Sequence, residues 1–146
     1  MGELQISKEE PFHQEDYRKI ENRFHPMVDV LIGNKGTKVP ALVDTGCTAG
    51  IWILKDQIKD LDIGEKISDE VSRYMVADGD IIGGEEYVSW VQINGEKQVV
   101  IVTVINPQNK IGHEEDGNMT PLLGRNFLDH YNVTFKGKIH KLELSR

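Results

Sequence analysis

An aspartate followed by threonine and glycine, Asp44-Thr45-Gly46, is the feature of this sequence best suited to chemistry. The tripeptide alone says little, because Asp-x-Gly is favoured in ordinary turns. Here it directly follows the apolar run 39–43, which predicts that the carboxylate stands at the end of a buried strand. A carboxylate in that place suits general acid–base chemistry. The alternative is a structural aspartate that caps a turn in a non-catalytic β-barrel.

The other groups that could react are a single cysteine and dispersed histidines. Cys47 directly follows the tripeptide, and we interpret it as an inert packing residue, since its neighbours match no nucleophile signature. An exposed thiol acting as a redox handle is the alternative. The histidines are too far apart for a zinc site, and Gly83-Gly84 is followed by two glutamates that would repel phosphate. The sequence therefore indicates neither a metal nor a cofactor.

The strand that ends at Asp44 is expected to belong to an all-β domain made of short hairpins. Apolar or alternating segments from residue 27 on are separated by glycine and asparagine, as is typical of strands and turns. The first predicted hairpin pairs residues 27–32 with 37–43 across Asn34-Lys35-Gly36. The further predicted hairpins pair residues 74–76 with 81–87, 88–93 with 98–105, and 133–135 with 139–144.

Two short helices, a loop and an extension complete the predicted organisation. Apolar side chains at helical spacing predict helices at residues 54–61 and 125–131. The polar segment 106–119 is expected to be an exposed loop. Residues 1–24 are predicted to be a polar N-terminal extension, mobile or loosely docked, and residues 25–146 to form the domain itself.

Two segments of the sequence resemble the retropepsin-like aspartic proteases. They are Ala41-Leu42-Val43-Asp44-Thr45-Gly46 and Pro121-Leu122-Leu123-Gly124-Arg125-Asn126-Phe127-Leu128. In that family the first segment is the catalytic loop, and the second is an apolar pair and a glycine that pack behind it before a short helix. The resemblance extends over roughly residues 27–144. It implies an all-β fold, namely a closed acid-protease (retropepsin-like) β-barrel with one or two short helices.

The resemblance implies that the chain carries half of an active site. Because the sequence has a single Asp-Thr-Gly motif, Asp44 would face its copy across a homodimer, and the two carboxylates would share one proton. Thr45 would hydrogen-bond across the pair, and Gly46 would let the main chain approach the carboxylate. The implied function is an aspartic endopeptidase that hydrolyses extended polypeptides. The alternative is a peptide-binding or assembly module that keeps the fold without cleaving.

The resemblance also places a flap at the hairpin around Asp78-Gly79. The residues predicted to close over a bound peptide are Val76, Ala77, Asp78, Gly79 and Ile81. Apolar walls beside the scissile bond are expected from several isoleucines and a valine, namely Ile51, Ile53, Val76, Ile81 and Ile82.

The composition limits the expected partners and location. The chain has 17 basic and 24 acidic residues, a formal net charge of -7, and the basic residues are scattered along the sequence. Neither nucleic acid nor a membrane is therefore an expected partner. The longest apolar runs are too short to span a bilayer, and the N-terminus lacks the apolar core of a signal peptide. Together with the single cysteine, this predicts a soluble cytoplasmic protein.

Overall fold

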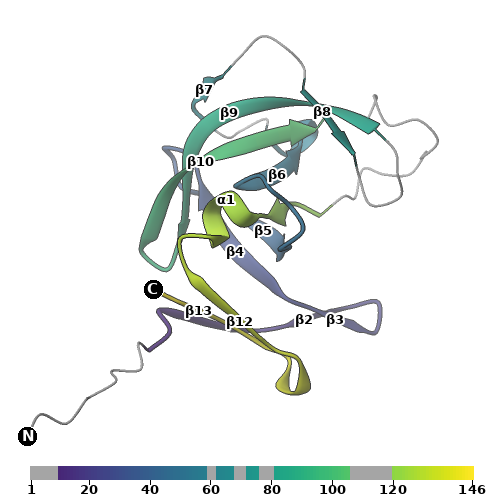
Figure 1. Ribbon diagram of the computed structural model, residues 1–146, viewed down its shortest axis with the longest axis vertical. Coiled ribbons are helices and arrows are strands. Elements are labelled where there is room, and N and C mark those ends of the chain that lie inside the picture. The colour runs from purple at the N-terminus through teal and green to yellow at the C-terminus, as the bar shows by residue number, and fades with distance from the viewer. Residues whose placement is uncertain (1–9, 59–61, 68–71, 76–80, 106–119) are drawn as a thin grey trace, which may run out of the picture.

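The computed structural model describes residues 10–58, 62–67, 72–75, 81–105 and 120–146 (Figure 1). The strands in these ranges are β1 (His13–Asp16), β2 (Arg18–Ile20), β3 (Arg23–His25), β4 (Met27–Ile32), β5 (Thr37–Val43), β6 (Ile51–Leu54), β7 (Glu65–Lys66), β8 (Ser72–Met75), β9 (Ile81–Ile93), β10 (Glu96–Ile105), β11 (Leu122–Leu123), β12 (Asn132–Lys136) and β13 (Lys141–Ser145). The helical segments are the 3-10 turns η1 (Lys55–Ile58) and η3 (Gly137–Ile139) and the short α-helix α1 (Arg125–Leu128).

Six of the described strands close into a barrel. The order around the ring is β10–β6–β11–β5–β4–β9, and β9 pairs again with β10. The β10–β6 and β5–β11 pairs are parallel, and the other pairs of the ring are antiparallel. The sheet therefore has no open edge within this ring. The prediction of a closed all-β barrel is confirmed, and among the described residues it carries a single short α-helix.

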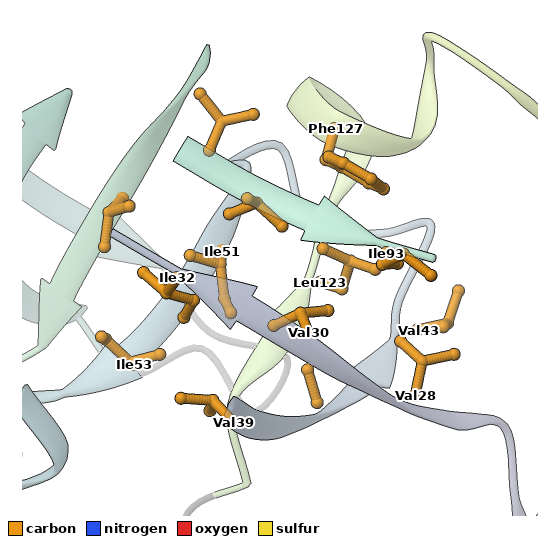
Figure 2. Packing of buried hydrophobic residues seen from close by; sticks show 14 of the residues in the cluster. Val28, Val30, Ile32, Val39, Val43, Ile51, Ile53, Ile93, Leu123 and Phe127 are labelled. Carbon is orange, nitrogen blue, oxygen red and sulfur yellow. The ribbon is translucent and has the colours of Figure 1, made fainter. Parts of the chain in front are cut away.

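Side chains that alternate along the strands fill the interior of the barrel. Val28, Val30 and Ile32 of β4 are fully buried, and Val30 lies opposite the buried Val39 of β5. Figure 2 shows this cluster, to which β6, β9, β11 and α1 also contribute. Burying one such side chain is worth about 1.5–3 kcal/mol. A one-residue slip of β4 would turn this whole set toward solvent, so the alternation fixes the register that delivers the end of β5.

The first predicted hairpin is confirmed with the same bounds, because β4 and β5 pair across a turn in which Gly33 and Gly36 have φ of 74° and 61°. The two predicted segments 81–87 and 88–93 are instead one continuous strand, β9. It pairs with β8 near its start and with β10 along the rest. No turn-forming residue separates the two segments, so the strand simply continues.

The predicted helices are shorter in the structure. Helix α1 ends at Leu128, and the following amides of His130 and Tyr131 bond carbonyls three residues back, which is turn geometry. In the other predicted helix, residues 55–58 form the 3-10 turn η1, and residues 59–61 lie outside the described ranges, as does the predicted loop 106–119. Within the described ranges no helix is long and apolar enough to cross a membrane.

From Glu10 on, the predicted N-terminal extension is part of the packed structure. Strand β1 pairs with β13 at the edge of a second sheet, β1–β13–β12. The Arg18 guanidinium contacts Glu15 at 2.9 Å and Asp29 at 3.0 Å, which ties β2 to the barrel strand β4. This differs from the mobile or loosely docked segment that the polar sequence predicts. Strand pairing uses main-chain groups, so a polar side-chain pattern does not reveal it.

Candidate active site

Strand β5 carries Asp44 to the end of the barrel. It runs between β4 and β11, and its last residues lie beside those of β11 in parallel register, Leu42 with Leu122 and Val43 with Leu123. The Asp44 amide then donates to the Leu123 carbonyl at 2.9 Å. The main chain of Asp44 is therefore anchored to a strand that lies about 80 residues away in sequence.

The main chain of the same loop also holds the Asp44 carboxylate. The Gly46 amide donates to Asp44 Oδ1 at 2.8 Å, and a Cβ on Gly46 would stand 3.2 Å from that oxygen. Asp44 is half-buried, whereas Thr45 and Gly46 are exposed. The loop therefore presents an oriented carboxylate at an open face, with the Thr45 side chain beside it in sequence.

A second segment, Gly124-Arg125-Asn126, supports this loop from behind. The Gly124 amide donates to the Gly50 carbonyl at 3.0 Å, and the Arg125 amide donates to the Cys47 carbonyl at 2.8 Å. The Asn126 side chain accepts the Ile101 amide at 2.8 Å, which joins α1 to β10. The resemblance implies packing for this segment, but the roles of Gly50 and Asn126 were not predicted. Small or polar residues beside the motifs are the only sequence signal that could have pointed to them.

Cys47 is a half-buried thiol that packs against the Gly124 segment. Burial raises the pKa of the thiol, and the nearby Asp44 charge raises it further, outweighing a hydrogen bond with the Ala49 main chain and the charge of Arg125, which lower it. The thiol is therefore protonated at neutral pH, which disfavours nucleophilic or redox chemistry. This agrees with its interpretation as a packing residue.

The predicted flap lies largely outside the described residues. Val76, Ala77, Asp78 and Gly79 fall in the undescribed range 76–80. Ile81 is the first residue of β9, and its main chain pairs with Met75 of β8. Those two strands are therefore antiparallel neighbours, and the chain between them is the segment for which a flap is predicted.

The prediction that two isoleucines of β6 line an apolar wall beside the scissile bond is wrong. Ile51 and Ile53 of β6 are 0% and 2% exposed and belong to the barrel core. They cannot line a cleft wall. Apolar residues on a buried strand read the same in sequence whether they face a core or a cleft, so the pattern alone could not separate the two.

No cluster of three or more potential metal ligands occurs within the part of the chain that the structure describes. Asp44 itself has the main chain of its own loop around it, with the Gly46 amide as donor. A single carboxylate in such a setting can accept or deliver a proton. It cannot by itself both activate water and polarise a carbonyl, which takes two groups.

Two solved structures share this architecture over most of the chain. A retropepsin-like aspartic protease from Rickettsia conorii superposes with a TM-score of 0.60 and 18% sequence identity, covering 90% of this chain and 89% of that one. EIAV protease, solved in complex with the inhibitor HBY-793, superposes with a TM-score of 0.55 and 17% identity, covering 76% and 91%. The chain has the retropepsin-like fold.

This likeness is one of structure. No protein-family model matches the sequence, and no curated protein matches it either. In the retropepsin-like barrel of this chain, the loop after β5 and the segment after β11 meet through the hydrogen bonds described above. The two sequence segments that resembled the family are thus the two that build this end of the barrel.

Proposed function

We propose that the chain is an aspartic endopeptidase that acts as a homodimer, with Asp44 of each copy forming one catalytic pair. The observation that carries the proposal is the placement of Asp44 on an open face of a retropepsin-like barrel, with its carboxylate oriented by the Gly46 amide. The chain has one Asp-Thr-Gly motif. A second copy is therefore the natural source of the second carboxylate.

The proposed chemistry follows from two carboxyl groups held close together. They cannot both ionise cheaply, so they share one proton, and the resulting pKa values belong to the pair. The ionised carboxylate takes a proton from water as the water oxygen bonds to the peptide carbonyl carbon, and the protonated carboxyl donates to the carbonyl oxygen. Collapse of the tetrahedral intermediate then breaks the C–N bond, and the departing nitrogen receives a proton from the pair.

The substrate proposed for this site is an extended polypeptide. A peptide lying along the open face would be paired by main-chain hydrogen bonds, and the segment between β8 and β9 would cover it. Thr45 is exposed beside Asp44 in the single chain, and in the dimer its hydroxyl would hydrogen-bond across the pair. No cofactor takes part in this mechanism.

The decisive experiment compares the wild type with Asp44→Asn on an unstructured protein such as casein, over a range of mildly acidic to neutral pH. The amide keeps the shape of the carboxylate and its acceptor oxygen for Gly46, so the variant is expected to fold and dimerise normally. Its cleavage rate should fall by at least about 10³-fold, because the general base is lost. Equal cleavage by both proteins would exclude Asp44 as the catalytic group.

Sedimentation at several concentrations separates this proposal from a non-catalytic peptide-binding module. A dimer is expected for the wild type and also for Asp44→Asn. A wild type that remains monomeric at the highest concentration and binds peptides equally well with and without Asp44 would instead identify a binding module.

A further inference from the structure

The β2–β3 hairpin stands apart from the two larger sheets. Within the described residues its strands pair only with each other, as a two-stranded sheet of their own. Figure 1 shows the hairpin leaving the lower end of β4 and extending sideways, clear of the barrel and away from the marked chain ends. A two-stranded hairpin by itself is at best marginally stable in water. This hairpin therefore depends on the contacts that its two faces make.

Two contacts hold the base of the hairpin on its own chain, one on each face. Arg18 lies on one face, and Phe24 with its cross-strand partner Lys19 lies on the other. The Arg18 guanidinium contacts Asp29 of β4 at 3.0 Å. The Phe24 ring stacks on the His140 ring, with centroids 3.8 Å apart. The base is thus fixed between the barrel and the turn that precedes β13.

The tip of the Arg18 face extends beyond these contacts. Ile20 and its cross-strand partner Arg23 lie on this face, two residues further along the hairpin than Arg18. Ile20 is 44% exposed, and Arg23 is exposed and makes no ion pair with another described residue. The face that rests on β4 through Arg18 therefore continues to an exposed aliphatic side chain and an unpaired cation.

The hairpin begins beside the loop that carries Asp44. Strand β3 leads through Pro26 into β4, and the Val43 amide at the end of β5 donates to the Pro26 carbonyl at 2.9 Å. Met27, the next residue, is paired with Leu42. The residue that closes the base of the hairpin is therefore bonded to the residue directly before the candidate catalytic carboxylate.

The proposed homodimer brings a second copy to the same place. Two carboxyl groups that share one proton lie about 3 Å apart, so each Asp44 would stand beside the two-fold axis. Three residue lengths, about 10 Å, separate the axis from the base of the hairpin, and the hairpin itself is about as long. An arm that leaves its own barrel so close to the axis is within reach of the other copy.

We propose that the β2–β3 hairpin is a dimerisation arm that packs on a second copy of this chain; the inference rests on the proposed function. Ile20 is then covered by the partner copy. Arg23 approaches a chain whose formal net charge is -7, so its charge favours the contact. Because a two-fold contact repeats every interaction, each dimer has two such arms.

Other occupants explain the hairpin less well. A polypeptide substrate is present only during turnover, so it would leave Ile20 in water in the free enzyme. An unrelated protein could cover the tip, but it would give no reason for the bond between Pro26 and the loop of Asp44. A second copy is present whenever the shared site is complete, and the same arrangement that brings the carboxylates together covers the arm.

Sedimentation over a range of concentrations tests the proposal, with the full chain and in an Asp44→Asn background. Ile20→Asp is expected to raise the dimer dissociation constant at least about tenfold, because it places a carboxylate in an apolar contact twice per dimer. Arg23→Glu should raise it about threefold or more. Cleavage per chain should fall at low concentration and return to the wild-type rate once the concentration is high enough to complete the dimers.

The matched controls make the same charge changes away from the arm. They are Val99→Asp on the outer face of β10 and Lys35→Glu in the β4–β5 turn, both at exposed positions, and they should dimerise like the wild type. Thermal unfolding checks the fold of every variant. Ile20→Ser takes the place of Ile20→Asp if the carboxylate unfolds the chain, and it should weaken the dimer at least about threefold.

Several outcomes would overturn the arm. They are unchanged dissociation constants in the arm variants, equal losses in the arm and control variants, and a wild type that stays monomeric. Lower cleavage by the arm variants at concentrations where dimers are complete would also overturn it and would identify the hairpin as a substrate contact. Equal cleavage by the wild type and Asp44→Asn would instead exclude the proposed catalytic pair, and sedimentation of the arm variants would still decide whether the hairpin holds the dimer.

Discussion

Gly124 stands where the two segments of the candidate site meet, and there is no room for a side chain there. A Cβ at this position would lie 2.2 Å from the Ala49 carbonyl oxygen and 2.7 Å from the Cys47 carbonyl oxygen. Both are main-chain atoms of the loop that follows Asp44, so relief would require the loop itself to move. The position of the carboxylate therefore depends on the absence of a side chain at Gly124.

Gly124→Ala is expected to destabilise the fold by about 1–3 kcal/mol, because overpacking against main-chain atoms forces a backbone shift. Urea unfolding measures the loss, and cleavage assays on the folded fraction should show reduced activity as well. Gly137→Ala is the control, since no atom lies within 4 Å of its added Cβ. If both variants had the wild-type stability, the close contact described for Gly124 would be contradicted.

Thr45 offers a test of the proposed contact across the dimer. Its side chain is exposed in the single chain, so neither Thr45→Ser nor Thr45→Val should change the stability of an isolated subunit by more than about 0.5 kcal/mol. The serine variant keeps a hydroxyl and should retain activity, whereas the valine variant should dimerise at least about fivefold more weakly. Sedimentation and cleavage assays measure both effects, and equal dimerisation of the two variants would argue against a hydroxyl contact.

For single residues, the sequence predicts a functional role only where the residues that define the role are adjacent in the chain. Asp44 and Gly46 could be predicted because the three adjacent residues of the motif and the apolar run before them all belong to one strand and its loop. Asn126 does not, because its side-chain partner, the Ile101 amide, is 25 residues away along the chain. The misassigned Ile51 belongs to the same class, since whether an apolar side chain faces a core or a cleft is decided by tertiary packing.

Among the elements, turn chemistry explains which predictions are confirmed. The β4–β5 hairpin has glycines with positive φ in its turn and alternating burial in its strands, and both signals are local. Strands β1 and β2 were not predicted, because their residues are polar and their pairing relies on main-chain groups and on the ion pairs of Arg18. Polar strands at the edge of a small sheet give little periodic signal.

Strand β9 carries a carboxylate whose ionisation should make stability depend on pH. The Tyr87 hydroxyl donates to Glu85 at 2.9 Å; this hydrogen bond, helped by Lys66 of β7, lowers the pKa of Glu85 below its ordinary value of 4.5. A carboxylate whose pKa is lower in the folded state than in the unfolded state stabilises the fold in full at pH values above the ordinary pKa of 4.5. The stabilisation is lost as the pH falls from 4.5 through the lower pKa of the folded state.

Tyr87→Phe keeps the ring and removes the hydrogen bond, so it should cost about 1 kcal/mol at neutral pH for this partly exposed pair. The difference from the wild type should shrink as the pH falls from 4.5 through the lower pKa of the folded state, because protonation of Glu85 weakens its hydrogen bond with the Tyr87 hydroxyl. Urea unfolding at several pH values measures this. In a Glu85→Gln background the same substitution should show no such pH dependence, and a constant difference in both backgrounds would disprove the role of Glu85.

For the whole molecule, barrel closure could not be read from the sequence alone. The closed barrel was implied by the resemblance of two short segments and not by periodicity, since parallel pairs such as β10 with β6 join segments about 50 residues apart. The contact between the two terminal hairpins is a second case, since the stacking of Phe24 on His140 joins residues 116 positions apart in the sequence.

Whether two molecules build one site is tested by mixing the wild type with Asp44→Asn at concentrations above the dimer midpoint. With random exchange at equal amounts, activity per wild-type chain should fall to about half, because half of the wild-type chains then have an inactive partner. A threefold excess of the variant should lower it to about a quarter. Albumin added in equal mass is the control. Activity that stays constant while the mixed dimers are shown to form would mean that each chain cleaves with its own Asp44 alone, and the shared-site mechanism would be wrong.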